Sequence, residues 1–151
     1  MSQESTPHRI RLRGPWQFAW QGEAPAGGTM QHPEDWPHVV GKRIGTLKLT
    51  RRFHAPTNLD ADEEVFVVLS GVFGAGDVTL NGRPLGAFDG SQTTWEFRLP
   101  HGLPRFNELA VVLTWPERTS ESHPTGLYDV VLLEIRRTGN AQKPGKSTPG
   151  F

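Results

Sequence analysis

The strongest strand and turn signals of this chain lie together in EVFVVLSGVFGAGDVTLNGRPLGAFDGSQTTWEFRL, residues Glu64–Leu99. The stretch opens with the β-branched apolar run Val65–Leu69, which is typical of a strand buried on both faces. After a glycine-rich interruption comes a second strand, Asp77–Leu80, and the dipeptide Asn81-Gly82 then predicts a tight turn between paired strands. Trp95–Leu99 alternates apolar and charged residues, as in a strand with one buried face. The stretch therefore predicts an all-β sandwich.

Strands are also predicted on both sides of this stretch. In Arg9–Trp20 the aromatic residues Trp16, Phe18 and Trp20 recur at every second position. They are expected to face the core rather than to form an exposed strip for stacking on sugars. Three more segments show the strand period, and they are Thr46–Phe53, Asn107–Trp115 and Tyr128–Arg137. The total is about eight antiparallel strands, the number expected of a jelly-roll β-sandwich.

One charged residue lies in phase with the apolar positions of its strand. Arg51 shares the period-two face of Leu47, Leu49 and Phe53. It is either a buried cation or the exposed end of the strand, and the sequence leaves both alternatives open. Because an unpaired buried charge is costly, a carboxylate partner is expected if Arg51 lies inside.

The composition restricts the classes of function. The 151 residues suit one domain, expected at residues 9–137, with disordered polar tails at residues 1–8 and 138–151. Sixteen basic and sixteen acidic residues cancel, so no binding to nucleic acid or to a membrane is expected. The chain has no cysteine, no signal-peptide core and no apolar run long enough for a membrane helix. A cytoplasmic location is therefore expected.

The order of several short motifs resembles the N-terminal sugar-binding domain of family 2 glycoside hydrolases. Each motif alone is weak, but together, in the same order, they are specific for the fold. They are Leu12-Arg13-Gly14-Pro15-Trp16-Gln17-Phe18, Pro33-Glu34-Asp35-Trp36, Arg51-Arg52-Phe53 with Pro56, Val78-Thr79-Leu80-Asn81-Gly82, Asn107-Glu108-Leu109-Ala110-Val111 and Gly126-Leu127-Tyr128-Asp129-Val130. The resemblance implies a galactose-binding-like jelly roll from about Ile10 to Arg137.

The resemblance also shows what this sequence lacks. In the family, the catalytic glutamates lie on a separate barrel of ~250 residues, so a chain of this length is expected to be non-catalytic and no catalytic residue is assigned. In β-galactosidases this domain lends the pocket an asparagine and an aspartate. The matching segments here, residues 39–45 and 117–124, contain neither residue type. Asn81 carries over only as a turn residue that favours positive φ.

Other chemistries receive little support from the sequence. Acidic side chains cluster in the turn Pro56–Glu64, but their spacing does not match an EF-hand, so a solvated loop is preferred to a calcium site. The six histidines show no His-x-x-x-His spacing, so no metal site and no cofactor are predicted. Sixteen acids form pairs by chance, so hydrolysis is not assigned to any pair.

On this fold a carbohydrate site is expected at the loops or on a concave face, where aromatic rings stack and polar groups bond to sugar hydroxyls. The candidates are Trp36, Arg83, Asp89, Gln92, His123 and Tyr128. For Trp36, a plug at the end of the sandwich is preferred to a ligand platform. The favoured function is a non-catalytic carbohydrate-binding module, accessory to a separate glycosidase. The alternative is an interaction or scaffold module whose partner is another protein or a second copy of the chain.

Overall fold

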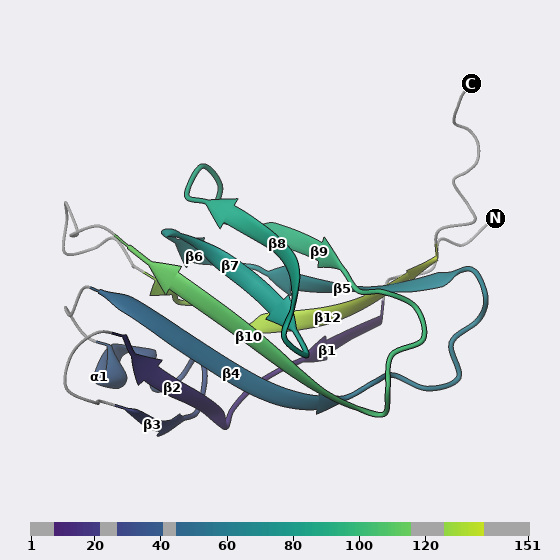
Figure 1. The fold of residues 1–151 in the computed structure, drawn as a ribbon, viewed down its shortest axis with the longest axis horizontal. Helices are drawn as coiled ribbons and strands as arrows, with labels where there is room; N and C mark the ends of the chain where they lie inside the picture. The colour runs from purple at the N-terminus through teal and green to yellow at the C-terminus, as the bar shows by residue number, and fades with distance from the viewer. Residues whose placement is uncertain (1–7, 22–26, 41–44, 116–125, 138–151) are drawn as a thin grey trace.

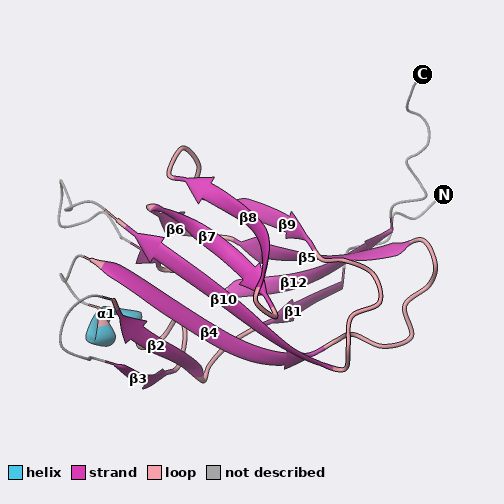
Figure 2. Cartoon of the chain, viewed as in Figure 1, coloured by secondary structure: helices cyan, strands magenta, loops and turns pink. Residues whose placement is uncertain are grey.

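The computed structural model describes residues 8–21, 27–40, 45–115 and 126–137, and they form a β-sandwich (Figure 1). Strands make up nearly all of its regular structure (Figure 2). In chain order the elements are β1 (His8–Arg11), β2 (Trp16–Trp20), β3 (Gly27–Met30), α1 (Trp36–Val39), β4 (Thr46–His54), β5 (Glu63–Leu69), β6 (Val72–Phe73), β7 (Ala75–Leu80), β8 (Arg83–Asp89), β9 (Trp95–Arg98), β10 (Phe106–Thr114), β11 (Gly126–Leu127) and β12 (Val131–Arg137). No helix in these residues has the length and apolarity needed to cross a membrane.

Two antiparallel sheets form the layers of the sandwich. The larger sheet has the order β3-β2-β4-β10-β7-β8, and the smaller sheet has the order β1-β12-β5-β9. A third, two-stranded sheet joins β11 to β6. In Figure 1 the long strands β4 and β10 run side by side in front of β5 and β12. The predicted all-β sandwich is therefore confirmed.

Alternating apolar side chains fill the space between the two sheets. From the larger sheet, Trp16, Leu49 and Val111 have no exposed surface. From the smaller sheet, Val67 and Leu133 are equally enclosed. All of them belong to one buried cluster, so the two sheets share a single core. This continuity follows from the period of two, which sends every second side chain of a strand to the same face.

The aromatic side chains of β2 face the core, as the sequence predicts. Trp16 and Trp20 are buried, and Phe18 is partly buried against the same core. The Trp16 indole Nε1 donates a hydrogen bond of 2.7 Å to the carbonyl oxygen of Leu12, so its polar atom is satisfied inside the core. The aromatic residues of β2 are packing residues and do not form an exposed strip.

The structure differs from the sequence-based prediction in the number and length of strands. Where about eight were expected, the described residues contain twelve, because short strands such as β3, β6 and β11 carry too few residues to show a period. β3 and α1 lie between β2 and β4, outside every segment for which the sequence predicted a strand. Pro37 lies in the first turn of α1, where its missing N–H costs nothing. His8, expected in the N-terminal tail, begins β1, while residues 1–7 and 138–151 lie outside the described residues.

The acidic turn before β5 is organised around an arginine. The guanidinium of Arg137 lies 2.9 Å from carboxylate oxygens of both Asp60 and Asp62, and 3.8 Å from Glu63. The carboxylates hold the pKa of Arg137 above its usual value. The turn predicted to be a solvated acidic loop is thus at least partly exposed, and one of its negative charges is balanced by the last residue of β12.

Candidate functional site

Three of the predicted ligand residues lie on segments that flank β6 at one end of the sandwich. The backbone N–H of Tyr128 donates to the Gly71 carbonyl at 3.1 Å, and the N–H of Val72 donates to the Thr93 carbonyl at 3.0 Å. These bonds place the start of β6 between Tyr128 and the β8–β9 loop, which follows Asp89 and carries Gln92. In Figure 1 this loop rises above β6 and β7. Tyr128, Asp89 and Gln92 are called the Tyr128 cluster below.

The Tyr128 ring is fixed in position by a glycine. A Cβ at Gly71 would come within 2.8 Å of Tyr128 Cε1 and 2.6 Å of the Asp129 Cβ, so only glycine allows the ring to lie there. The side chain of Tyr128 is half-buried, and those of Asp89 and Gln92 are exposed. An aromatic ring that is partly exposed and two exposed polar side chains on nearby segments are groups suited to stacking and hydrogen bonding.

The β8–β9 loop is held in shape by its own side chains. Asp89 Oδ1 accepts bonds from the backbone N–H of Ser91 at 2.9 Å and from its hydroxyl at 2.6 Å. These bonds lower the pKa of Asp89, so this carboxylate stays ionised near neutral pH. The Trp95 indole N–H donates to the Gln92 carbonyl at 3.0 Å. The loop therefore presents a defined acceptor at Asp89 and leaves the Gln92 amide exposed.

Trp36 lies beneath this end of the sandwich and not on its surface. Its side chain is 6% exposed and its ring contacts His32 edge-on and Trp115 at centroid distances of 5.6 and 6.0 Å. A side chain at Gly126 would collide with its indole. The burial agrees with the preferred interpretation of Trp36 as a plug, and the ring offers no platform to a ligand in this structure.

Buried His32 completes the packing below the cluster. Its Nε2 donates to the Leu127 carbonyl at 2.7 Å, since a carbonyl oxygen can only accept. Its Nδ1 is buried without a hydrogen-bond partner. Burial lowers the pKa of His32, against the opposing effects of the Leu127 bond and of the Glu34 and Asp129 carboxylates. The imidazole is therefore neutral near pH 7. No sequence pattern indicates this role, because a lone histidine between predicted strands resembles any solvated one.

The remaining predicted residues lie elsewhere or outside the described residues. Arg83 follows the β7–β8 turn and lines a separate hollow of about 780 Å³ with Arg98 and His101. His123 lies outside the described residues, as do residues 41–44 and 116–125. Most of the two segments where β-galactosidases carry their contacts therefore have no described structure here. The predicted set does not form one site, because Arg83 stands at the other end of β8 from Asp89.

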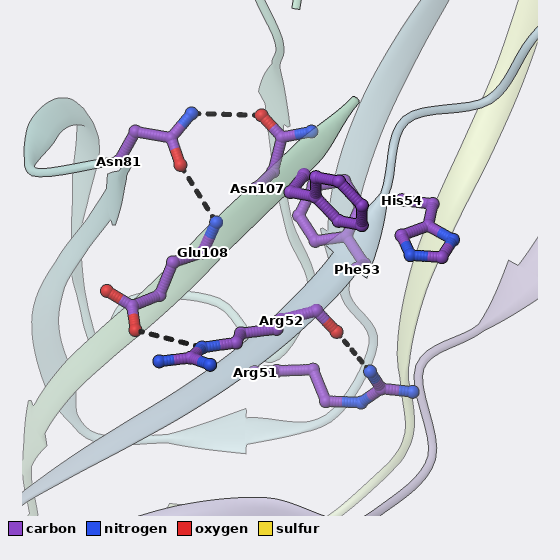
Figure 3. A pocket seen from close by; sticks show the side chains of 8 residues that line it. Arg51, Arg52, Phe53, His54, Asn81, Asn107 and Glu108 are labelled. Atoms are coloured by element: carbon purple, nitrogen blue, oxygen red, sulfur yellow. Dashed lines mark hydrogen bonds and ion pairs between the residues drawn. The ribbon is translucent and has the colours of Figure 1, made fainter. Parts of the chain in front are cut away.

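A second hollow, which sequence reasoning missed, lies where β4 ends and β10 begins (Figure 3). It encloses about 650 Å³ and is called the β4–β10 hollow below. It is lined by Arg51, Arg52, Phe53, His54, Asn81, Phe106, Asn107 and Glu108. The register of β4 and β10 brings these residues together, because Phe106 pairs with His54 and Glu108 pairs with Arg52 across the two strands. Residues far apart in the sequence thus meet on one surface.

Arg51 lies between the two alternatives that the sequence left open, a buried cation and an exposed strand end. It is neither fully buried nor fully exposed, and among the described residues no carboxylate lies within ion-pair distance of it. Its Nε donates to the Arg13 carbonyl at 2.7 Å and its Nη1 donates to the Arg52 carbonyl. Burial lowers its pKa, but an arginine remains charged. Partial exposure explains why the expected carboxylate is not required: water and two carbonyl dipoles solvate the cation.

No family model matches this chain, and no curated protein matches its sequence. Solved structures do match it. An FMN-binding β-glucuronidase from Facaelibacterium prausnitzii L2-6 aligns with a TM-score of 0.71 and 18% identity, over 87% of this chain and 23% of that chain. A Bifidobacterium dentium β-glucuronidase complexed with coumarin-3-O-glucuronide aligns with a TM-score of 0.68 and 18% identity, over 90% of this chain and 31% of that chain. A GH2 β-galacturonidase from Eisenbergiella tayi, bound to galacturonate, aligns with a TM-score of 0.62 and 20% identity, over 89% of this chain and 25% of that chain.

The chain has the fold of part of a GH2 glycosidase. The resemblance that the motifs suggested is therefore confirmed at the level of fold. The chain spans between 23% and 31% of the length of these enzymes. At identities of 20% or less the match to GH2 enzymes establishes the fold alone, and their activities are not transferred by it.

Proposed function

We propose that this chain is a non-catalytic carbohydrate-binding module that binds a saccharide at the Tyr128 cluster. The observation that supports the proposal is that the backbone segments carrying Tyr128, Asp89 and Gln92 all lie beside β6 and β7. The Tyr128 ring packs closely on Gly71, and the side chains of Asp89, at the end of β8, and of Gln92, in the loop that follows, are exposed. A ring for the apolar face of a sugar, a fixed carboxylate and an amide are the groups that saccharide recognition uses.

The fold supports the same proposal. Solved structures that share it include a β-glucuronidase and a β-galacturonidase, and the match covers about a quarter of their length. We infer that the module assists a separate glycosidase by holding its substrate, and that the module itself carries no catalytic pair. The alternative, an interaction or scaffold module on the same fold, would make the Tyr128 cluster an ordinary solvated surface.

The test is binding of the whole chain to a broad glycan array, followed by titration calorimetry with the best ligand. We expect Tyr128→Ala and Gln92→Ala each to weaken binding at least about tenfold, because tenfold corresponds to about 1.4 kcal/mol, roughly one stacking or hydrogen-bond contact. Tyr128→Phe keeps the ring and is expected to stay within a few-fold of wild type.

Arg83→Ala is the matched control, because Arg83 is an exposed predicted residue at the far end of β8. It should leave binding unchanged, and circular dichroism should show that every variant is folded. If no glycan on the array binds, the interaction module becomes the better hypothesis. If a glycan binds equally to wild type and Tyr128→Ala, the site lies elsewhere on the molecule.

A further inference from the structure

The β4–β10 hollow lies at the opposite end of β4 from the Tyr128 cluster and shares no residue with it. We propose that this hollow is a second binding site, and that its ligand is an acidic saccharide, a sugar ring that carries a carboxylate. Arg51 and Arg52 would bind the carboxylate, Glu108 and His54 would bond to hydroxyls, and Phe106 would cover the ring. The proposal does not depend on the proposed function of the Tyr128 cluster.

The positive charge in the hollow exceeds the negative charge. Arg51 bonds only to the carbonyl oxygens of Arg13 and Arg52, so none of its charge is balanced by a carboxylate among the described residues. The side chain of Arg52 is 85% exposed and meets Glu108 at 3.8 Å, which is longer than a hydrogen bond. A loose exposed pair contributes little, so Arg52 is available to a ligand. Guanidinium groups match carboxylates in shape and charge.

The position of Arg51 follows from the end of a strand pairing. β2 pairs with β4 only as far as Thr50. Beyond it the Arg51 side chain turns around the free edge of β4 and reaches the backbone of Arg52, as Figure 3 shows. Two successive residues of a strand normally face opposite sides. The bend around the edge lets both guanidinium groups line one hollow.

The single carboxylate in the hollow restricts the kind of anion that fits. Glu108 lines the same surface as the two arginines and would repel a ligand that is only an anion. Its oxygens accept hydrogen bonds, and so favour a ligand that also carries hydroxyl donors. His54 adds a second group that can bond to a hydroxyl. A sugar acid fits both kinds of group, because its carboxylate can pair with the arginines and its hydroxyls can donate to Glu108.

An exposed aromatic ring supplies the apolar contact. Phe106 is 65% exposed, more than any other large apolar residue in the described part of the chain. Its ring meets the His54 ring edge-on at 4.9 Å, and the Arg105 guanidinium lies 5.4 Å from its centroid. These contacts hold the ring in place, so that a sugar face can pack on it without a large loss of side-chain entropy.

The wall of the hollow is already rigid. Asn81 Nδ2 donates to Asn107 Oδ1 at 2.9 Å, Asn81 Oδ1 accepts from the Glu108 N–H at 2.8 Å, and Asn107 Nδ2 donates to the Pro104 carbonyl at 2.8 Å. These amides are used within the protein and are not assigned to the ligand. Their bonds fix the Glu108 backbone, so the carboxylate starts from a defined place.

The experiment is calorimetric titration of the whole chain with glucuronate, glucose and acetate at low salt. Glucuronate tests the complete site, glucose tests the ring without the charge, and acetate tests the charge without the ring. We expect glucuronate to bind at least tenfold more tightly than either of the others, and to weaken as salt is added. Arg52→Gln and Phe106→Ala should each weaken glucuronate binding at least tenfold, and so should Arg51→Gln.

The exposed Arg52 and Phe106 keep the test valid even if the half-buried Arg51 cannot be replaced without unfolding. Arg83→Gln, an exposed arginine of another hollow, is the matched control and should bind glucuronate like wild type. Equal binding of acetate, equal binding of glucose, or no binding of glucuronate would each overturn the proposal. So would loss of glucuronate binding in Tyr128→Ala with full binding in Arg52→Gln, which would assign the sugar to the Tyr128 cluster instead.

Discussion

At the scale of single residues, His32 links burial to protonation. The ring donates from Nε2 to the Leu127 carbonyl, and its buried Nδ1 has no hydrogen-bond partner. Adding a proton to Nδ1 would place a charge between Trp16, Trp36 and the Leu127 carbonyl, and burial disfavours that charge more than the Glu34 and Asp129 carboxylates favour it. The pKa of His32 is therefore lower in the folded protein than in the unfolded chain.

This difference predicts a pH dependence of stability. In the unfolded chain His32 takes up a proton near its ordinary pKa of about 6.5, whereas the folded protein resists protonation. The contribution of His32 to the free energy of unfolding is complete above pH 6.5. It falls as the pH drops below that value, because the unfolded state then binds more protons. We expect the urea midpoint to decline between pH 7 and pH 5, and the decline to be smaller in His32→Gln, whose amide can still donate to Leu127.

His54→Gln is the control for this prediction, because His54 is exposed and its ring lies outside the core. It shows how far the loss of an exposed histidine alone changes the pH profile. A His32→Gln profile with the same slope as wild type would show that His32 titrates equally in the two states. Glu134 affects stability in a different pH range. The Arg9 hydrogen bond is the main cause of its lowered pKa, so its contribution to the free energy of unfolding is lost only as the pH falls below about 4.5.

At the scale of elements, the β7–β8 hairpin depends on one asparagine in two ways. Asn81 and Gly82 have φ angles of 54° and 83°, as a two-residue turn with left-handed backbone at both positions requires. The Asn81 side chain also bonds to Asn107 and to the Glu108 N–H. The sequence predicted the turn from Asn81-Gly82, and the structure confirms the positive φ.

The two roles can be separated by substitution. Asn81→Gly removes the side-chain bonds but keeps the backbone angle, and is expected to cost about 1 kcal/mol. Asn81→Ala removes the bonds and also places a Cβ at positive φ, which adds roughly another 1 kcal/mol. Urea unfolding measures both. Equal losses in the two variants would mean that the angle carries no cost, and losses near zero would mean that the bonds to β10 are replaced by water.

The strands that the sequence predicted best are those with a long, regular period. Thr46–Phe53 and Asn107–Trp115 were predicted within a residue or so of β4 and β10, because alternation over eight or nine residues identifies the buried face. β3 and β6 carry too few residues for that. The β4–β10 hollow was beyond sequence reasoning for a different reason. It depends on the register that pairs Phe106 with His54 and on the Arg51 side chain turning around a strand edge, and neither is encoded locally.

The candidate residues at the loops show the same limit. Asp89, Gln92 and Tyr128 were proposed for their chemistry, and their approach to one another depends on how β6 pairs with β11 and bonds to the β8–β9 loop. Arg83 was proposed on the same grounds and lies in another hollow. Residue type identifies which side chains suit a sugar, whereas only the tertiary contacts decide which of them meet.

At the scale of the whole molecule, one core spans both sheets. Trp16, the first residue of β2, is fully enclosed in it, and its indole bonds to the Leu12 carbonyl in the segment that joins β1 of the smaller sheet to β2 of the larger. A small domain with one such core is expected to unfold in a single cooperative step. Damage to one sheet should then lower the stability of the other by the same amount.

Trp16→Ala tests this coupling. Removing the indole is expected to lower the free energy of unfolding by about 3–5 kcal/mol, since the side chain leaves a large cavity and an unpaired carbonyl. Tryptophan fluorescence from the remaining residues and far-UV circular dichroism should give the same reduced urea midpoint. Gln17→Ala, exposed on the same strand, is the control and should change the midpoint little. A loss below about 1 kcal/mol would contradict the core position of Trp16, and two separated midpoints would show that the sheets unfold independently.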